Sequence, residues 1–281
     1  MEIILGKPAR VGKTYAPVGQ CIYCGAKEWS EERSRKLGDE HVVPEGLGGR
    51  IILPEASCKR CEEITSNFEL EWLRGAYYTV RVQKGLGKKK KRAPRFVNLQ
   101  VRKNGKTIWQ PVPIEKYPAM AVTLVFDKPD ILSDCAPVEK RLSGGVAIGT
   151  LPSFGQLLRP YWPENEVSWV PPRNTATSEH LGRMLAKIAH SYTVAEIGVD
   201  GFKPFLKDIV LGDDTRCLGH YVGGTRDIPQ AIDDVYDVKL TIVKSTANRE
   251  YLMVTIRLLS DVQGMPEYWV VVGEPSNGGS A

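Results

Sequence analysis

The chain has 281 residues, of which 42% are hydrophobic and 25% are charged. This composition is typical of a globular protein with one large or two smaller domains. It excludes an intrinsically disordered protein, which would have low hydrophobicity and high net charge. No apolar run approaches the ~20 residues that a membrane-spanning helix needs, and the first residues lack the pattern of a secretory signal. We therefore expect a cytoplasmic protein with no membrane contact. The net charge of +5 says little about partners.

Four of the six cysteines form two C-x-x-C pairs, Cys21 with Cys24 and Cys58 with Cys61. In a reducing compartment such pairs are typical of thiolate ligands, and four thiolates in a tetrahedron suit Zn²⁺. The 33 residues between Cys24 and Cys58 exceed the spacing of a simple zinc ribbon, so a further element is inserted there. The sequence predicts a structural zinc; the alternative is four cysteines without a ligand.

The insert and the segment after it have the pattern of two short strands and a helix. Residues 41–44 favour a strand, the glycines of 46–49 a turn, and residues 50–53 a second strand. Apolar residues recur at helical spacing from 57 to about 84, where Gly85 ends the pattern. A carboxylate beside a histidine on the first strand would point the two side chains to opposite sides. The layout expected is therefore ββα.

Three motifs in this region together resemble one known family. They are CIYCG at 21–25, DEHVVPEGLGG at 39–49 and ASCKRCEEITSNFE at 56–69. In order and spacing they are similar to the HNH endonucleases, in the subgroup whose ββα-metal core is braced by a four-cysteine zinc. The resemblance spans roughly residues 21–70.

The resemblance implies a role for each matching residue. His41 would be the general base that activates water against the scissile phosphate, and Glu40 would bind the catalytic cation, Mg²⁺ or Mn²⁺. The family's second cation ligand, usually His or Asn, lies on the helix; Glu62 stands at that position here, with Asn67 and Glu69 as alternatives. The four cysteines match the zinc ligands. A neutral imidazole can accept a proton at pH 7, and oxygen ligands suit Mg²⁺ or Mn²⁺.

A second hypothesis belongs to another functional class. The chain could be a catalytically inactive, zinc-containing nucleic-acid-binding or signalling module, in which Glu40 and His41 only complete a polar strand. Two features bear on this choice: residues 50–57 lack the Asn that the family often has there, and Glu62 replaces His or Asn.

The positive charge of the chain is concentrated in one segment. Residues 81–106 contain eleven Lys or Arg and no Asp or Glu. We expect this segment to contact the phosphates of DNA. Contacts with phosphates do not distinguish one base sequence from another. The residues expected at its tip, in a mobile loop, are Lys88, Lys89, Lys90, Lys91 and Arg92. The alternative is an ordinary solvated loop.

The remaining sequence predicts an α+β fold without a catalytic motif of its own. We expect a hairpin at 96–112, a strand at 122–126, an amphipathic helix at 178–199 and an antiparallel sheet from 236–243, 251–259 and 267–272. The predicted organisation is a zinc-braced ββα-metal module at 1–85, a basic linker and hairpin at 86–120, and a mixed α+β domain at 121–281. The last segment would serve substrate choice, homo-oligomer formation or a protein partner.

Overall fold

The computed structural model of the protein describes residues 3–4, 12–30, 36–86, 94–103, 105–139, 142, 144–161, 166–168 and 177–276. Within these residues the fold is mixed α+β and its sheets are almost entirely antiparallel. The predicted fold class is confirmed at this level.

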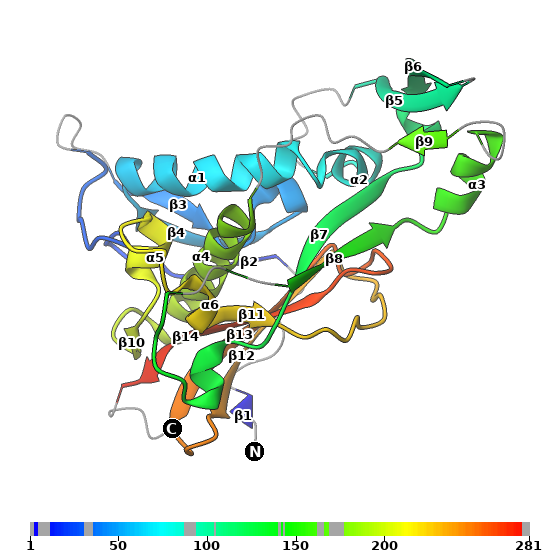
Figure 1. Ribbon diagram of the computed structural model, residues 1–281. Coiled ribbons are helices and arrows are strands. Elements are labelled where there is room, and N and C mark those ends of the chain that lie inside the picture. The colour runs from blue at the N-terminus through cyan, green and yellow to red at the C-terminus, as the bar shows by residue number, and fades with distance from the viewer. Residues whose placement is uncertain are drawn as a thin grey trace.

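The largest sheet comes mainly from the C-terminal half, and its three long strands are drawn in orange to red in Figure 1. Its strands are β1 (Ile3–Ile4), β10 (Phe202–Pro204), β11 (Val222–Gly224), β12 (Tyr236–Lys244), β13 (Glu250–Leu258) and β14 (Glu267–Pro275). The order is β1-β12-β13-β14-β10, with β11 also paired to β14. The three long strands have alternating or continuous apolar residues, which is why they form the centre of the sheet. The predicted antiparallel sheet is confirmed.

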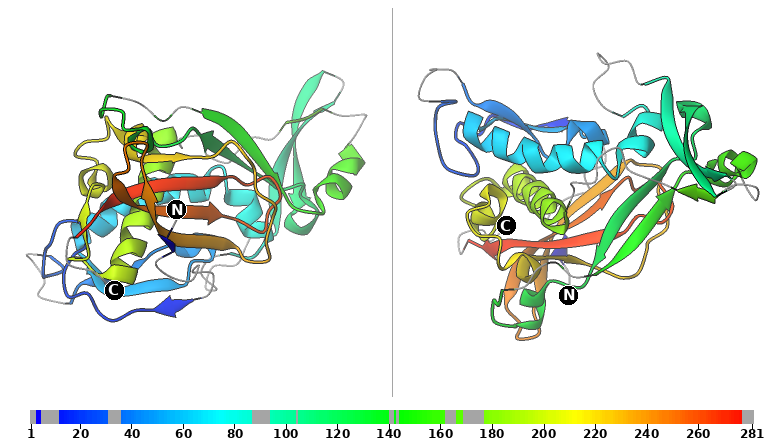
Figure 2. Two further views of the ribbon diagram at one scale, coloured as in Figure 1. Left: turned by 90° about the horizontal axis from the view of Figure 1, so that it is seen from below. Right: turned by 45° about the horizontal axis from the view of Figure 1, so that its top comes forward.

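A central helix, α4 (Ser178–Ile197), separates this sheet from the N-terminal region. It contacts the sheet on one side and α1 (Lys59–Arg74) on the other (Figure 1), and seen from below the sheet lies in front of α1 (Figure 2). Thr177 caps its N-terminus by accepting a hydrogen bond from the His180 amide. Nearly every residue from Leu181 to Val194 is buried, so α4 is a core helix and not a surface helix. Two short helices, α5 (Lys207–Leu211) and α6 (Leu218–Tyr221), follow it.

The N-terminal region contains a hairpin followed by a helix, which we call the hairpin–helix unit. It consists of β3 (Gly38–His41), β4 (Ile51–Ser57) and α1, and β4 also pairs with the short β2 (Lys13–Thr14). Strands β3 and β4 are antiparallel, and α1 contacts β3. Between the strands, a short 3-10 helix (Glu45–Leu47) and left-handed Gly48 make the turn. The ββα layout expected from the sequence is therefore present, although the first strand ends at His41.

The predicted helix of residues 57–84 is two helices. Helix α1 ends at Gly75, and α2 (Tyr78–Gln83) follows after a bend. Gly75 has a backbone conformation (φ −97°, ψ −111°) that is not helical, and the Tyr77 amide donates to the carbonyl of Trp72. Both helices contribute buried residues at helical spacing, Phe68 and Trp72 in α1 and Val80 in α2, so periodicity alone does not reveal the bend.

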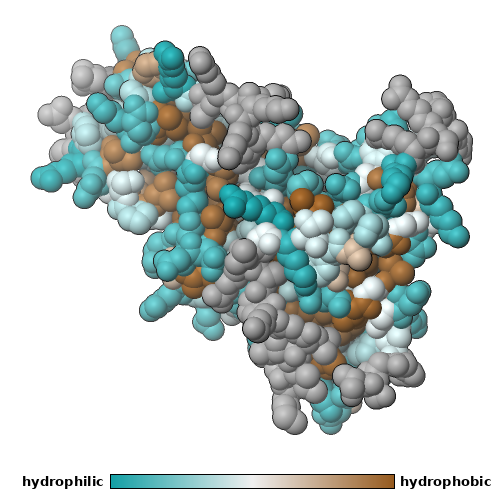
Figure 3. Space-filling model, turned by 180° about the vertical axis from the view of Figure 1, so that it is seen from behind, coloured by the Kyte–Doolittle hydropathy of each residue, from teal (hydrophilic) through white to brown (hydrophobic). Residues whose placement is uncertain are grey.

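A projecting part of the molecule, which we call the arm, extends away from both regions (Figure 1). It consists of β5 (Phe96–Lys103), β6 (Lys106–Pro113), β9 (Glu166–Ser168) and α3 (Phe154–Leu158), and the pair β7 (Met120–Phe126) and β8 (Gly144–Thr150) leads into it. The predicted hairpin is confirmed. Figure 3 shows apolar side chains at the surface of this projecting part, and Phe96 and Trp109 are 58% and 55% exposed.

One continuous hydrophobic cluster includes side chains from all three predicted segments, from Cys21 to Val272. The predicted division of the chain near residues 85 and 120 stays a prediction. In that same part of the chain, none of the helices has the length and apolarity that would allow it to cross a membrane.

Candidate metal centre

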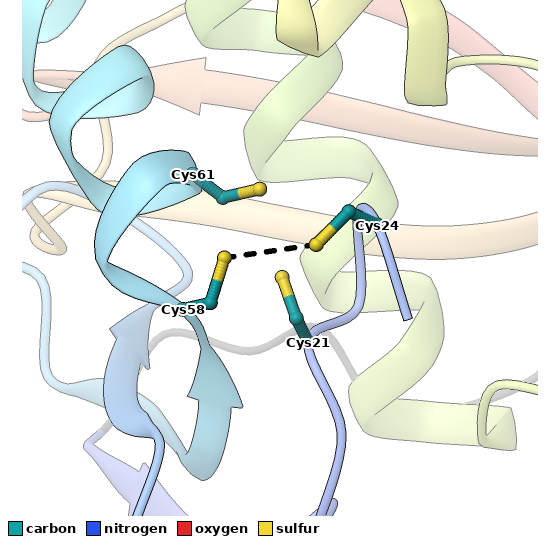
Figure 4. Close-up of side chains that lie close together, drawn as sticks. All are labelled: Cys21, Cys24, Cys58 and Cys61. Atoms are coloured by element: carbon teal, nitrogen blue, oxygen red, sulfur yellow. Dashed lines mark hydrogen bonds between the residues drawn. The ribbon is translucent and has the colours of Figure 1, made fainter. Parts of the chain in front are cut away.

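Four sulfur atoms converge at the base of the hairpin–helix unit (Figure 4). Cys21 and Cys24 come from the loop before β3, and Cys58 and Cys61 from the start of α1. All four sulfurs lie within 4.8 Å of one another, and the Cys24 and Cys58 sulfurs are 3.6 Å apart. The sequence prediction that the two C-x-x-C pairs meet is confirmed, and the group could bind a metal such as zinc.

Local backbone structure aims each pair inward. In the loop, the amide of Gly25 donates to the carbonyl of Cys21 at 2.8 Å, and left-handed Gly25 reverses the chain there. At the helix, Cys58 is the N-cap residue in extended conformation, so Cys61 lies one turn later on the same side. The local turn of the backbone therefore determines the conformation within each C-x-x-C pair. Only the approach of one pair to the other depends on the tertiary structure.

The electrostatics of the four sulfurs favour a bound cation. A hydrogen bond from Cys61 lowers the pKa of Cys21 to about 4, and the same contact raises the pKa of Cys61 above its usual range. Burial raises the pKa of Cys58. Four thiolates this close repel one another, and a divalent soft cation relieves that repulsion because it coordinates all four. The donor set therefore fits zinc.

The carboxylate of Glu40, the predicted cation ligand, forms an ion pair with a lysine side chain in the interior of the protein. It is a buried residue of β3, and its carboxylate lies 2.5 Å from the ammonium of Lys187 on α4. Lys187 also pairs with Glu69 of α1 at 3.0 Å. We call these three residues the ammonium–carboxylate cluster. It joins the hairpin, α1 and α4 in the interior of the protein.

Lys187 has further partners in β3 and the residue after it. Its ammonium donates to the carbonyl of His41 and, at 3.4 Å, to the carbonyl of Val42. Burial by itself would lower the pKa of Lys187, but the charges of Glu40 and Glu69 outweigh it and raise that pKa. Burial also raises the pKa of Glu69, against the pull of Lys187. Lys187 therefore stays charged at neutral pH.

His41 and Glu62 lie nearer the surface than Glu40. His41 is half-buried at the end of β3. Glu62 lines an open surface groove together with Trp29 and Asn67, and one of its oxygens lies beside Gly38 at the start of β3. Among the described residues, the cysteines are the one group of three or more His, Cys, Asp or Glu side chains close enough to share an ion. The predicted catalytic residues do not form a second such group.

Two cations of the basic segment at 81–106 form contacts within the folded protein. The Arg81 guanidinium donates to the carbonyls of Gly46 and Leu73, both at 2.5 Å, and Lys84 pairs with Asp261. These two cations support the hairpin turn and the contact with the C-terminal half. The predicted DNA-contacting residues, Lys88 to Arg92, lie outside the described residues.

Lys187 is the site residue that sequence reasoning missed. It lies three residues after Met184 and four before Ser191, on a stripe of α4 that is otherwise apolar or small. A lysine within such a stripe is a signal, because lysine is almost never fully buried without a partner of opposite charge. The signal gives no partner, however, since Glu40 is 147 positions away in the sequence.

Comparison of this chain with protein-family models, with curated proteins and with solved structures found no match. The resemblance to HNH endonucleases therefore depends on the three sequence motifs.

Proposed function

We propose that this protein is an HNH-type endonuclease that hydrolyses DNA phosphodiester bonds, with a structural zinc on the four cysteines and His41 as general base. The observation that carries the proposal is the half-buried position of His41 on a hairpin that leads into a cysteine-braced helix. Histidine is the most frequent general base in enzymes, and His41 lies at the edge of the hairpin–helix unit, which supports this assignment.

The proposal includes a catalytic Mg²⁺ or Mn²⁺, and the residues present fit this ion only in part. Glu62 faces an open groove, where a cation could keep the water ligands that Mg²⁺ prefers. Glu40 does not fit, because its carboxylate is buried against Lys187. We therefore derive no catalytic step through the ion. The step of hydrolysis that we assign to a residue of this chain is the transfer of a proton from water to the imidazole of His41.

The test is cleavage of supercoiled plasmid by the zinc-loaded protein with Mg²⁺ or Mn²⁺. His41→Ala should lower the rate by about 10²-fold or more, the usual contribution of a positioned general base. His180→Ala is a matched control, because His180 is also half-buried but lies at the start of α4. Unchanged cleavage by His41→Ala with intact folding and zinc content would refute the assigned base.

DNA is the proposed partner because of the charge of residues 81–106. Neutralising Lys88 to Lys91 should weaken binding and flatten its salt dependence, since each phosphate contact contributes about 0.9 to the slope of log K against log salt. A slope identical to that of the unmodified chain would remove this segment from the interface.

The second candidate is the catalytically inactive zinc-containing module that binds nucleic acid or takes part in signalling. The observation that favours it is the neutralisation of Glu40 by Lys187. The plasmid experiment separates the two candidates: the inactive module binds DNA and shows no cleavage with either cation, whereas the nuclease cleaves and depends on His41.

A further inference from the structure

We propose that the ammonium of Lys187 occupies the position of a divalent cation at Glu40, so that Glu40 and Glu69 bind a cation supplied by this chain and hold no Mg²⁺ or Mn²⁺. The inference goes beyond the proposed function, because it concerns cation binding and holds for a nuclease and for an inactive module alike.

The first argument is the set of atoms around the lysine nitrogen. Oxygens of Glu40 and Glu69 lie 2.5 Å and 3.0 Å from it, and the carbonyls of His41 and Val42 accept hydrogen bonds from it. Carboxylate and carbonyl oxygens are the ligands of a hard metal cation. An ammonium offers a single positive charge and three donors to the same oxygens. The interior thus contains an oxygen-lined cation position, and Lys187 fills it.

The second argument is burial. The side chains of Lys187, Glu40 and Glu69 are 2%, 6% and 15% exposed. A bound Mg²⁺ usually keeps several waters, and this interior offers little room for them while the lysine side chain is present. Lys187 is also held in place from behind, because the α4 residues around it are buried between α1 and the sheet.

The third argument is the charge balance. Two carboxylates and one ammonium sum to −1 when all are ionised, and a divalent ion added beside Lys187 would raise the sum to +1 in a medium of low dielectric constant. The ammonium of Lys187 repels a second cation placed beside it, so the two carboxylates bind such an ion less strongly than they would without Lys187.

The experiment measures Mn²⁺ binding to the zinc-loaded full chain by electron paramagnetic resonance. We compare the unmodified chain with Glu40→Gln, Lys187→Met and Lys203→Met; the last is a control, because Lys203 is an exposed lysine of β10 that pairs with Glu274 of the neighbouring β14. Glu40→Gln should leave Mn²⁺ affinity unchanged in the unmodified background. Lys187→Met should raise it at least about tenfold, and Glu40→Gln added to Lys187→Met should abolish that gain.

Two results would overturn the inference. One is a Mn²⁺ site in the unmodified chain that Glu40→Gln weakens, which would make Glu40 a metal ligand beside Lys187. The other is a folded Lys187→Met variant with no gain in Mn²⁺ affinity. If Lys187→Met does not fold, the comparison of the unmodified chain with Glu40→Gln decides alone. These readouts do not use cleavage, so a failure of the proposed nuclease activity leaves them unaffected.

Discussion

Helix α1 contributes to two clusters of side chains that can be negatively charged, and the source of positive charge differs between them. At the start of the helix, Cys58 and Cys61 meet two cysteines of the preceding loop in a group that fits an added metal ion. Two turns later, Glu69 meets Glu40, and the positive charge comes from Lys187 of the same chain. The first cluster could bind a cation from solution, whereas the second already contains a cation of the chain, the ammonium of Lys187. The comparison teaches that packing can pair a carboxylate with a side chain that lies far away in the sequence.

The largest effect is expected at the cysteine cluster. Cys58→Ser should abolish zinc binding and unfold the hairpin–helix unit, because binding of a structural zinc contributes about 10–16 kcal/mol in small zinc domains. Zinc content by elemental analysis and helix content by circular dichroism measure the result. Cys135→Ser is the control, since Cys135 is exposed and lies outside the cluster. A Cys58→Ser protein with full zinc and native stability would exclude the four-sulfur site.

A smaller effect is expected at the ammonium–carboxylate cluster. Lys187→Met should lower the free energy of unfolding by about 3–5 kcal/mol, because it leaves two buried carboxylates without their cation. Chemical denaturation measures this change. Adding Glu40→Gln to Lys187→Met should restore part of the loss by removing one of those charges. Equal stability of Lys187→Met and the unmodified chain would show that the cluster does not hold the two regions together.

The smallest effect is expected at the buried His190 of α4. It lies one turn after Lys187 and contacts the loop that contains Cys21 and Cys24. Its Nε2 donates to the carbonyl of Ile22 at 2.9 Å, and burial lowers its pKa to about 4. In the unfolded chain it gains a proton below pH 6.5, so acid favours unfolding in the window from 6.5 to 4. The loss attributable to His190 is about 3 kcal/mol at the acid end of that window.

His190→Gln should therefore flatten the dependence of stability on pH between 6.5 and 4 relative to the unmodified chain. The measurement is denaturant unfolding at a series of pH values, with zinc content followed in parallel because acid also protonates the cysteines. Parallel curves for the two proteins would mean that His190 titrates normally in the folded state.

The sequence predicted the local parts of this molecule well, for a physical reason. The hairpin at β5–β6, helix α4 and strands β12 to β14 are long periodic or turn-bounded segments, whose pattern depends on neighbours within a few residues. The break at Gly75 was missed because buried residues recur at helical spacing in the helices on either side of it. The division into three segments came from the motifs and from the change in charge along the chain, and it stays a prediction.

The sequence by itself determined that two cysteine pairs face one another, because each pair is built by a local turn and the paired spacing is specific to metal sites. Only the tertiary structure decided the environment of Glu40. Its partner, Lys187, is brought to it by the packing of α4 against α1, which no local pattern encodes. Charges separated by long stretches of chain are paired by packing, and in a buried site that pairing determines which cation a carboxylate can hold.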